Sequence, residues 1–416
     1  MKKISTIALL LVVAMVFTGC SSEEMKLYNA FQQSQEITSM ESDTDITFTL
    51  GTEGLSQQDQ QQVDQMQTML KDSKISLHQK MIQNEEKTIA KAKVDLGMTF
   101  GGMGIDTNIW VDVDNSGKTP KLVEVIKMPA IAMASMAAAS PEFQNKEYLV
   151  YDFNQIMDMN MDQGQKIDYN KLMTFSKDLQ PKFTAFLKDY AKQFNSGLNI
   201  VEYKGNQSID GKNVAVYELK LDDQSFKKLI KYSANNLLEN EDAMKFVKEY
   251  MNIAVDMVET KDVEKEDAKA EIEQGLNELE KNIPEFKEKM NQFMDAFNDV
   301  KIIGDKGIVI EYSINEEGFI VAEKGSIDLN IDLGAIEKAA TKIDNEQKAS
   351  PVHKTGVFKI GLNFDTKMYN INEEIEIDKP ALTFENTMYL SDLMKSAMQS
   401  YETDVETVEE NEIVPQ

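Results

Sequence analysis

Residue types that could do chemistry are scarce in this chain of 416 residues. It has a single cysteine, Cys20, and two histidines, His78 and His353, that lie far apart in the sequence. A lone cysteine cannot form a disulfide within the chain, and neither histidine has a second one at the spacing of a zinc motif. The sequence therefore predicts no disulfide and no zinc site.

Three short motifs together match a serine-nucleophile set. Ser225 and Lys228 form an S-x-x-K motif, Ser233 and Asn235 form S-x-N, and residues 354–356 read Lys-Thr-Gly before a predicted strand. The set resembles that of penicillin-binding proteins and β-lactamases, in which the serine attacks the substrate. However, Ser225 and Ser233 lie close together on one predicted helix, whereas that family brings its motifs together from separate elements. We therefore interpret the three as chance matches and predict that the protein is not an enzyme.

Two further patterns point to metal ions. Residues 112–117, Asp-Val-Asp-Asn-Ser-Gly, begin like a calcium loop, but the twelfth position is Val123 instead of glutamate. Met157, Met159 and Met161 offer thioethers that suit copper(I), yet methionine is frequent, with 25 residues in the chain. A polar turn and a packing segment explain these patterns better. We predict no metal and no other cofactor.

One uncharged segment, residues 129–141, is rich in alanine and methionine. It contains Ile131, Met133 and Met136. Because methionine adapts to irregular apolar shapes, these three residues are candidates for the lining or the lid of an apolar ligand site. The alternative, which we favour, is a small helix buried under a sheet.

The N-terminal segment is typical of an exported protein. Lys2 and Lys3 precede the mainly apolar residues 4–17, a run too short to span a bilayer comfortably. The run ends in Val-Phe-Thr-Gly-Cys, residues 16–20, which resembles the lipobox of bacterial lipoproteins, with Phe17 in the place of the more usual leucine.

This resemblance implies that residues 1–19 are a signal peptide and that residues 20–24 are a lipidated tether. Cys20 would carry diacylglycerol and acyl groups that bind the protein to the membrane. No second apolar stretch in the sequence is long enough to span a bilayer. We expect the protein on the outer face of the cell membrane.

The charge balance is strongly acidic, with 71 acidic against 44 basic residues and a formal net charge of −27. All the basic residues are lysines, and loss of Lys2 and Lys3 with the signal peptide would bring the charge to −29. Nucleic-acid binding needs a basic surface and favours arginine, so we exclude it. The use of lysine in place of arginine fits AT-rich codons and indicates a low-GC Gram-positive bacterium.

Period-two patterns of apolar residues predict antiparallel strands separated by helices. An amphipathic helix is expected over residues 25–39, and glycines 101, 102 and 104 and the pair Asp210-Gly211 are expected in hairpin turns. Strands are predicted around residues 46–50, 75–81, 90–100, 105–113, 122–128, 200–203, 214–221, 308–314, 327–333 and 358–364. Helices are predicted around residues 56–70, 172–197 and 225–259. A further helix, broken near Pro284, is predicted to end near residue 297, and a short helix is predicted just beyond Tyr389. Residues 402–416 are predicted to be a disordered acidic tail.

This order of elements resembles the LolA/LppX-like lipoprotein families. The resemblance is best over residues 25–222, and residues 25–46, with Phe31 and Ile37 ahead of the first strand, carry most of it. It implies an α+β fold in which an antiparallel sheet curls as an open half-barrel with covering helices and a cavity for acyl chains. We divide the rest into residues 223–390, a helical insertion plus a second strand region, and 391–416, a short helix and acidic tail. The order also fits two similar halves, although no residue-level repeat supports a duplication.

Two functions follow from this interpretation. The first is a non-enzymatic, lipid-anchored, extracytoplasmic binding protein for an apolar or acyl-chain ligand. The second is a structural or interaction lipoprotein of the cell or spore envelope, which would bind another envelope protein and no small molecule. A transporter's solute-binding protein would have alternating βα units, and the predicted hairpins argue against this class of protein.

The anchor is directly testable through Cys20→Ser. Without the thiol no thioether to diacylglycerol can form, so the variant should accumulate as uncleaved precursor or leave the membrane fraction. Intact mass and fractionation of the membrane measure this, with the wild-type chain as the reference. A variant that still gives a mature, membrane-bound product would refute the lipoprotein interpretation.

Overall fold

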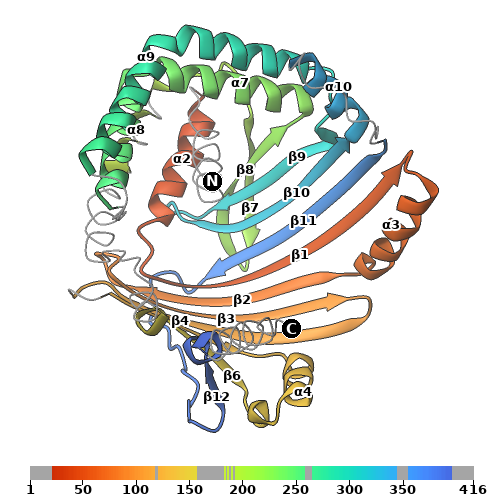
Figure 1. Ribbon diagram of the computed structural model, residues 1–416, viewed down its shortest axis with the longest axis vertical. Helices are drawn as coiled ribbons and strands as arrows, with labels where there is room; N and C mark the ends of the chain where they lie inside the picture. The colour runs from red at the N-terminus through yellow and green to blue at the C-terminus, as the bar shows by residue number, and fades with distance from the viewer. Residues whose placement is uncertain are drawn as a thin grey trace, which may run out of the picture.

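The computed structural model describes residues 21–117, 120–156, 193–257, 265–343 and 355–395, and a few residues between 182 and 190. These residues form an α+β fold around a 12-stranded sheet with the order β12-β6-β5-β4-β3-β2-β1-β11-β10-β9-β8-β7 (Figure 1). The pairing is antiparallel throughout except between β12 and β6. The sheet does not close on itself, because β12 and β7 are its two free edges. The predicted α+β class with an antiparallel sheet is confirmed.

The sheet consists of two meanders in which neighbouring strands follow one another in sequence. The N-terminal meander runs through β1 Ser39–Glu53, β2 Lys74–Gln83, β3 Ile89–Phe100, β4 Met103–Asp114, β5 Lys121–Lys127 and β6 Tyr148–Asp152. The C-terminal meander runs through β7 Val201–Ile209, β8 Lys212–Leu221, β9 Ile303–Ile314, β10 Ile320–Asp332 and β11 Val357–Tyr369, and the short β12 Thr387–Tyr389 lies beside β6.

Strands β1 and β11 join the two meanders in the middle of the sheet. Their antiparallel register runs without a break from Glu41 opposite Tyr369 to Glu53 opposite Val357. The strands on either side of residue 222 therefore belong to one sheet, and the predicted boundary there divides the sequence without dividing the sheet.

Two hairpins turn where the sequence predicted them. Gly101 and Gly102 have φ values of 56° and 78°, and Asp210 and Gly211 have 50° and 79°. Consecutive positive φ values define the type I′ turn, whose twist matches that of the flanking strands. Gly104, by contrast, lies within β4 and outside the turn.

The first two helices of the described residues begin at serine caps. Helix α2 spans Ser22–Ser34, and its N-cap Ser21 forms a reciprocal capping box with Glu24. It therefore begins earlier than predicted and ends before Ile37, which is nevertheless buried. Helix α3 spans Gln57–Leu70 behind the N-cap Ser56, as predicted from the glutamine-rich segment.

The helices of the C-terminal half depart from the prediction in three places. The single helix predicted after residue 225 is two, α7 Asp223–Glu239 and α8 Glu241–Met257, because the Asn240 side chain caps the second by accepting from the Ala243 amide at 2.9 Å. Helix α9, Lys265–Ala296, continues through Pro284 and changes direction along its length (Figure 1). The strand predicted to reach residue 333 stops at Asp332, whose carboxylate accepts from the Ala335 amide and begins α10, Leu333–Ile343.

Other predictions fall partly or wholly outside the described residues. Cys20, the three alternating methionines, His353, Lys354 and the acidic tail lie beyond them, as does most of the predicted aromatic helix. Two residues of that helix, Tyr190 and Phe194, are described and buried. Residues 390–395 are helical, as the sequence predicted beyond Tyr389.

The fully buried core lies at the β7–β9 end of the sheet, under α2 and α7. Leu27 of α2, Leu229 of α7 and Leu219 of β8 expose 2 % of their surface or less. The Phe31 ring packs edge-on against Tyr312 of β9, with ring centroids 5.2 Å apart. Glu24 is buried with them, and its carboxyl group accepts a hydrogen bond from the Ile200 amide at 3.2 Å.

Substitution of Gly307 in β9 tests how closely the β8 and β9 backbones pack at this end of the sheet. Its φ is +76°, and an added Cβ would lie 2.7 Å from the carbonyl oxygen of Leu221. Gly307→Ala should therefore lower the free energy of unfolding by about 1–3 kcal/mol, because strain and the backbone clash add. Urea denaturation measures it.

Gly104→Ala is the matched control, since nothing lies within 4 Å of its Cβ position. It should change stability by less than about 0.5 kcal/mol. Equal losses in the two variants would contradict the account of the β8–β9 contact.

Candidate functional site

The period-two alternation gives the sheet two chemically different faces. On β1, Asp43 and Asp45 are exposed on one side, while Ile46 and Phe48 alternate with exposed Thr47. We call the side with Asp43 the polar face and the side with Phe48 the apolar face. Cross-strand registers extend both faces over the neighbouring strands. His78 of β2 lies beside Asp43 on the polar face, and Leu362 of β11 lies beside Phe48 on the apolar face.

The polar face holds an open hollow of about 750 Å³ over β11, β1, β2, β3 and β4. Carboxylates dominate its charge, and His78 and Lys367 are its basic side chains. The acidic residues of its lining are Asp43, Asp45, Asp95, Asp106 and Asp365.

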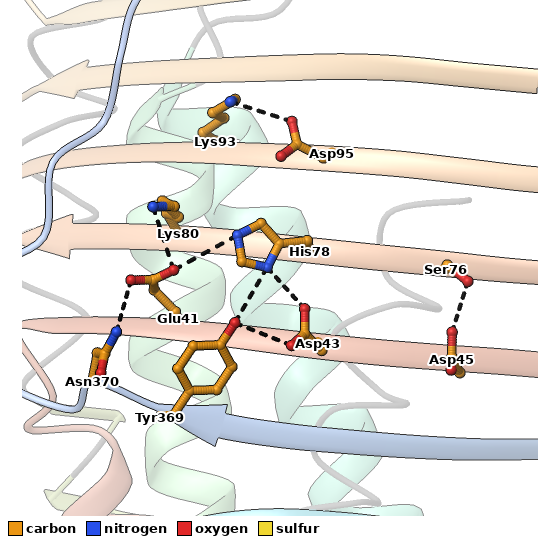
Figure 2. Close-up of polar contacts among 10 residues, drawn as sticks. All are labelled: Glu41, Asp43, Asp45, Ser76, His78, Lys80, Lys93, Asp95, Tyr369 and Asn370. Atoms are coloured by element: carbon orange, nitrogen blue, oxygen red, sulfur yellow. Dashed lines mark hydrogen bonds and ion pairs between the residues drawn. The ribbon is translucent and has the colours of Figure 1, made fainter.

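His78 connects carboxylates of this face with a tyrosine, as Figure 2 shows. Its Nδ1 lies 2.8 Å from the Asp43 carboxylate, and its Nε2 lies 3.7 Å from that of Glu41. The Tyr369 hydroxyl donates to Asp43 at 3.1 Å and lies 3.4 Å from His78 Nδ1. Because β2, β1 and β11 are adjacent, the network depends on the pairing of the two meanders.

The surroundings of Tyr369 and Glu41 shift the pKa values of both side chains. Partial burial, the hydrogen bond to Asp43 and nearby negative charge raise the pKa of Tyr369 to about 12. The Asn370 amide, 2.9 Å from Glu41, is the main reason that the pKa of Glu41 is lowered, and Lys80 adds to it. At neutral pH Tyr369 is thus a neutral donor and Glu41 an ionised acceptor, an arrangement suited to holding side chains in place.

The other sequence motifs stay apart or take structural roles. Ser225 and Ser233 lie on the same helix, α7, where the Ser225 amide donates to the capping Asp222. Asp114 accepts from the Ser116 amide and hydroxyl in a tight turn. Across the described part of the chain, no three His, Cys, Asp or Glu side chains are arranged to hold a metal ion.

Residues 370–386, which we call the strap, cross the polar face of β4 and β5. The indole Nε1 of Trp110 donates to the Asp378 carbonyl at 2.7 Å, and Lys379 pairs with Asp112. Ile377 and Leu382 of the strap help to enclose a smaller hollow of about 180 Å³ beside Trp110. Lys121 also pairs with Asp112, at 3.3 Å, so two lysines share this carboxylate.

The alanine- and methionine-rich segment forms helix α4, Ala130–Ala139, at the β5–β6 end of the sheet (Figure 1). Ile131 exposes 62 % of its surface, and Met133 and Met136 are half-buried. The favoured interpretation of a helix buried under the sheet is therefore wrong, because α4 lies at the end of the sheet and not beneath its centre. The hollows described above are lined by other residues.

The apolar face is packed unevenly. At β8 and β9 its residues are buried, as Tyr217 and Tyr312 show with 5 % exposure each. On the central strands its side chains are only half-buried, including Ile46, Phe48, Leu50, Leu77, Leu96, Ile327, Leu329, Ile360, Leu362 and Phe364. A wide apolar surface thus continues from a closed core into a region that is not fully covered.

A carboxyl group lies on the apolar face next to the closed core. Glu323 of β10 lies between Tyr312 of β9 and Thr366 of β11, and burial raises the pKa of Glu323. The hydroxyls of Thr366 and Thr44 are 2.9 Å apart. Sequence reasoning missed Glu323 because the strand was predicted to begin near residue 327, whereas β10 begins at Ile320.

In comparisons with known proteins, no family model matches the chain, and no curated protein matches it significantly. Among the described residues, no helix combines the length and the apolar composition needed to cross a bilayer.

The strap gives a pH-dependent prediction. Hydrogen bonds and charge from Lys379 and Lys121 outweigh burial and lower the pKa of Asp112. A lowered pKa means that the carboxylate stabilises the folded state at neutral pH, and this contribution is lost as the pH falls below about 4 and through the lowered pKa. Asp112→Asn should therefore cost about 0.5–1.5 kcal/mol at neutral pH, with the difference disappearing in acid.

Fluorescence of Trp110, the only tryptophan, reports the strap directly and should be followed during urea denaturation. Asp114→Asn is the control, since Asp114 bonds only to its own turn in the described structure and should leave the strap in place. A cost for Asp112→Asn that is the same in acid as at neutral pH would rule out the charge-based explanation.

Proposed function

We propose that this protein is a lipid-anchored, extracytoplasmic binding protein for an apolar or acyl-chain ligand. In this proposal the sheet curls as an open half-barrel, helices cover its concave apolar face, and the chain performs no catalysis. Acyl groups on Cys20 hold it to the outer face of the cell membrane. After loss of the signal peptide, a body with a formal charge of −29 is repelled by anionic lipid, so the anchor must supply the attachment.

The uneven packing of the apolar face carries the proposal. Aliphatic and aromatic side chains from β10, β11, β1, β2 and β3 form one continuous surface that remains half-buried. Covering such a surface gains about 25 cal/mol for each Å² of apolar area removed from water. An acyl chain laid along Phe48, Leu362 and Leu329 would obtain this free energy without needing any hydrogen bond.

The alternative is a structural or interaction lipoprotein of the cell or spore envelope. Two apolar side chains far from the core favour a protein contact: Phe384 in the strap exposes 93 % of its surface and Ile131 in α4 exposes 62 %. We rank this second, because two side chains offer much less apolar area than the central strands do.

Ligand content separates the two functions. Every described element begins after residue 20, so a chain of residues 21–416 includes the whole described fold. Its organic extract should contain bound lipid by mass spectrometry, and the delipidated protein should take up a fluorescent fatty acid. An intact mass without ligand, together with no uptake of the fatty acid, would leave the envelope function.

A substitution on each face of the sheet locates the site. Leu362→Trp fills space over the centre of the apolar face and should reduce fatty-acid uptake at least about tenfold, a loss of about 1.4 kcal/mol. Thr47→Trp places the same side chain on the exposed polar face of adjacent β1 and should leave uptake unchanged. Equal uptake by the two variants, both folded by circular dichroism, would place the ligand elsewhere.

A further inference from the structure

The polar residues on the apolar face form a row at one level of the sheet. The register places Tyr312 of β9, Glu323 of β10, Thr366 of β11 and Thr44 of β1 side by side. The 2.9 Å contact between Thr44 and Thr366 hydroxyls shows that both point to this face. Residues above and below the row are mainly apolar, among them Ile310, Phe364 and Ile46.

Glu323 stands at the point where the closed core ends. On one side, Tyr312 is 5 % exposed and packs against Phe31 of α2. On the other side, Thr366 and Thr44 are half-buried, like the apolar residues of the central strands. Two residues along β10 on the same face, the Phe364 ring covers Gly325, where an added Cβ would meet it at 2.5 Å. The carboxyl group therefore has apolar surroundings and open access on one side.

In the described part of the chain, the carboxyl group of Glu323 lacks the partners that such surroundings demand. Among the described residues none donates a hydrogen bond to it or forms an ion pair with it, and burial alone accounts for its raised pKa. Lys324 next to it points to the polar face, toward Asp365. A polar group left in apolar surroundings without a partner costs free energy, which a ligand that supplies the partner recovers.

We propose that Glu323, Thr366 and Thr44 bind the head group of a neutral, hydroxyl-bearing lipid, such as the glycerol of a monoacylglycerol, while its acyl chain lies along the central apolar face. This proposal rests on the apolar-ligand function proposed above and specifies the ligand class. The row is made of hydroxyls, which donate and accept hydrogen bonds, and one carboxyl group, which accepts them from a hydroxyl. It contains no cation, so an anionic head group finds no counter-charge there.

Photolabelling of the full chain tests the head-group preference. The lipidated protein is reconstituted in phosphatidylcholine vesicles and offered three probes with the same photoreactive acyl chain: a monoacylglycerol, a fatty acid and a long-chain primary amine. The wild type should be labelled by the monoacylglycerol at least about fivefold more than by either other probe, the preference expected of one or two added hydrogen bonds.

Variants assign that preference to the row. Glu323→Leu and the isosteric Thr366→Val should bring the ratio of monoacylglycerol to fatty-acid labelling close to one while fatty-acid labelling persists. Asp365→Asn removes a carboxylate from the exposed polar face beside Thr366 and should keep the wild-type ratio. Thr366→Val preserves volume and strand preference, so the test stands even if Glu323→Leu fails to fold.

The outcomes distinguish the two proposals. A wild type that prefers the amine or shows no preference, or an unchanged ratio in the folded Thr366→Val variant, would overturn the head-group assignment and leave acyl binding intact. No labelling by any probe would overturn both, because the apolar face would then hold no acyl chain at all.

Discussion

The pairing of β1 with β11 is the interaction on which the rest of the structure depends. It joins segments such as Thr44 and Thr366, which are 322 residues apart in the sequence. Closing so long a loop costs conformational entropy that only a long, continuous ladder and buried side chains repay. The unbroken register from Glu41 to Glu53 supplies that ladder, and its apolar pairs, such as Phe48 with Leu362, contribute the rest.

This one pairing determines which side chains meet on each face of the sheet. On the polar face it brings Tyr369 of β11 to Asp43 of β1 and so completes the His78 network. On the apolar face it sets Thr366 beside Thr44 and continues the surface from the closed core to the half-buried centre. A slip of one residue would exchange the two faces, because side chains alternate along each strand. The alternation of Ile46, Phe48 and Leu50 with threonines strongly disfavours such a slip.

The two faces also differ in how their polar groups are satisfied. On the polar face, carboxylates such as Asp45 and Asp112 have lysine partners that lower their pKa values. On the apolar face, Glu323 lacks such a partner among the described residues, and burial raises its pKa. Paired surface charges contribute modestly to stability, whereas an unpaired polar group in apolar surroundings is costly.

Local signals in the sequence determined the hairpins at Gly101-Gly102 and Asp210-Gly211, the Ser56 cap of α3 and the apolar side of β1, because each depends on neighbouring residues. The same kind of evidence failed at Asn240, whose side-chain cap divides one predicted helix into two, and at Leu333, where the Asp332 cap ends the strand and begins a helix. The sequence could not determine that β1 pairs with β11, that Tyr369 meets His78, or that Glu323 lies among apolar residues. These are contacts between distant segments, and only the tertiary structure decides which strands become neighbours and which side chains they bring together.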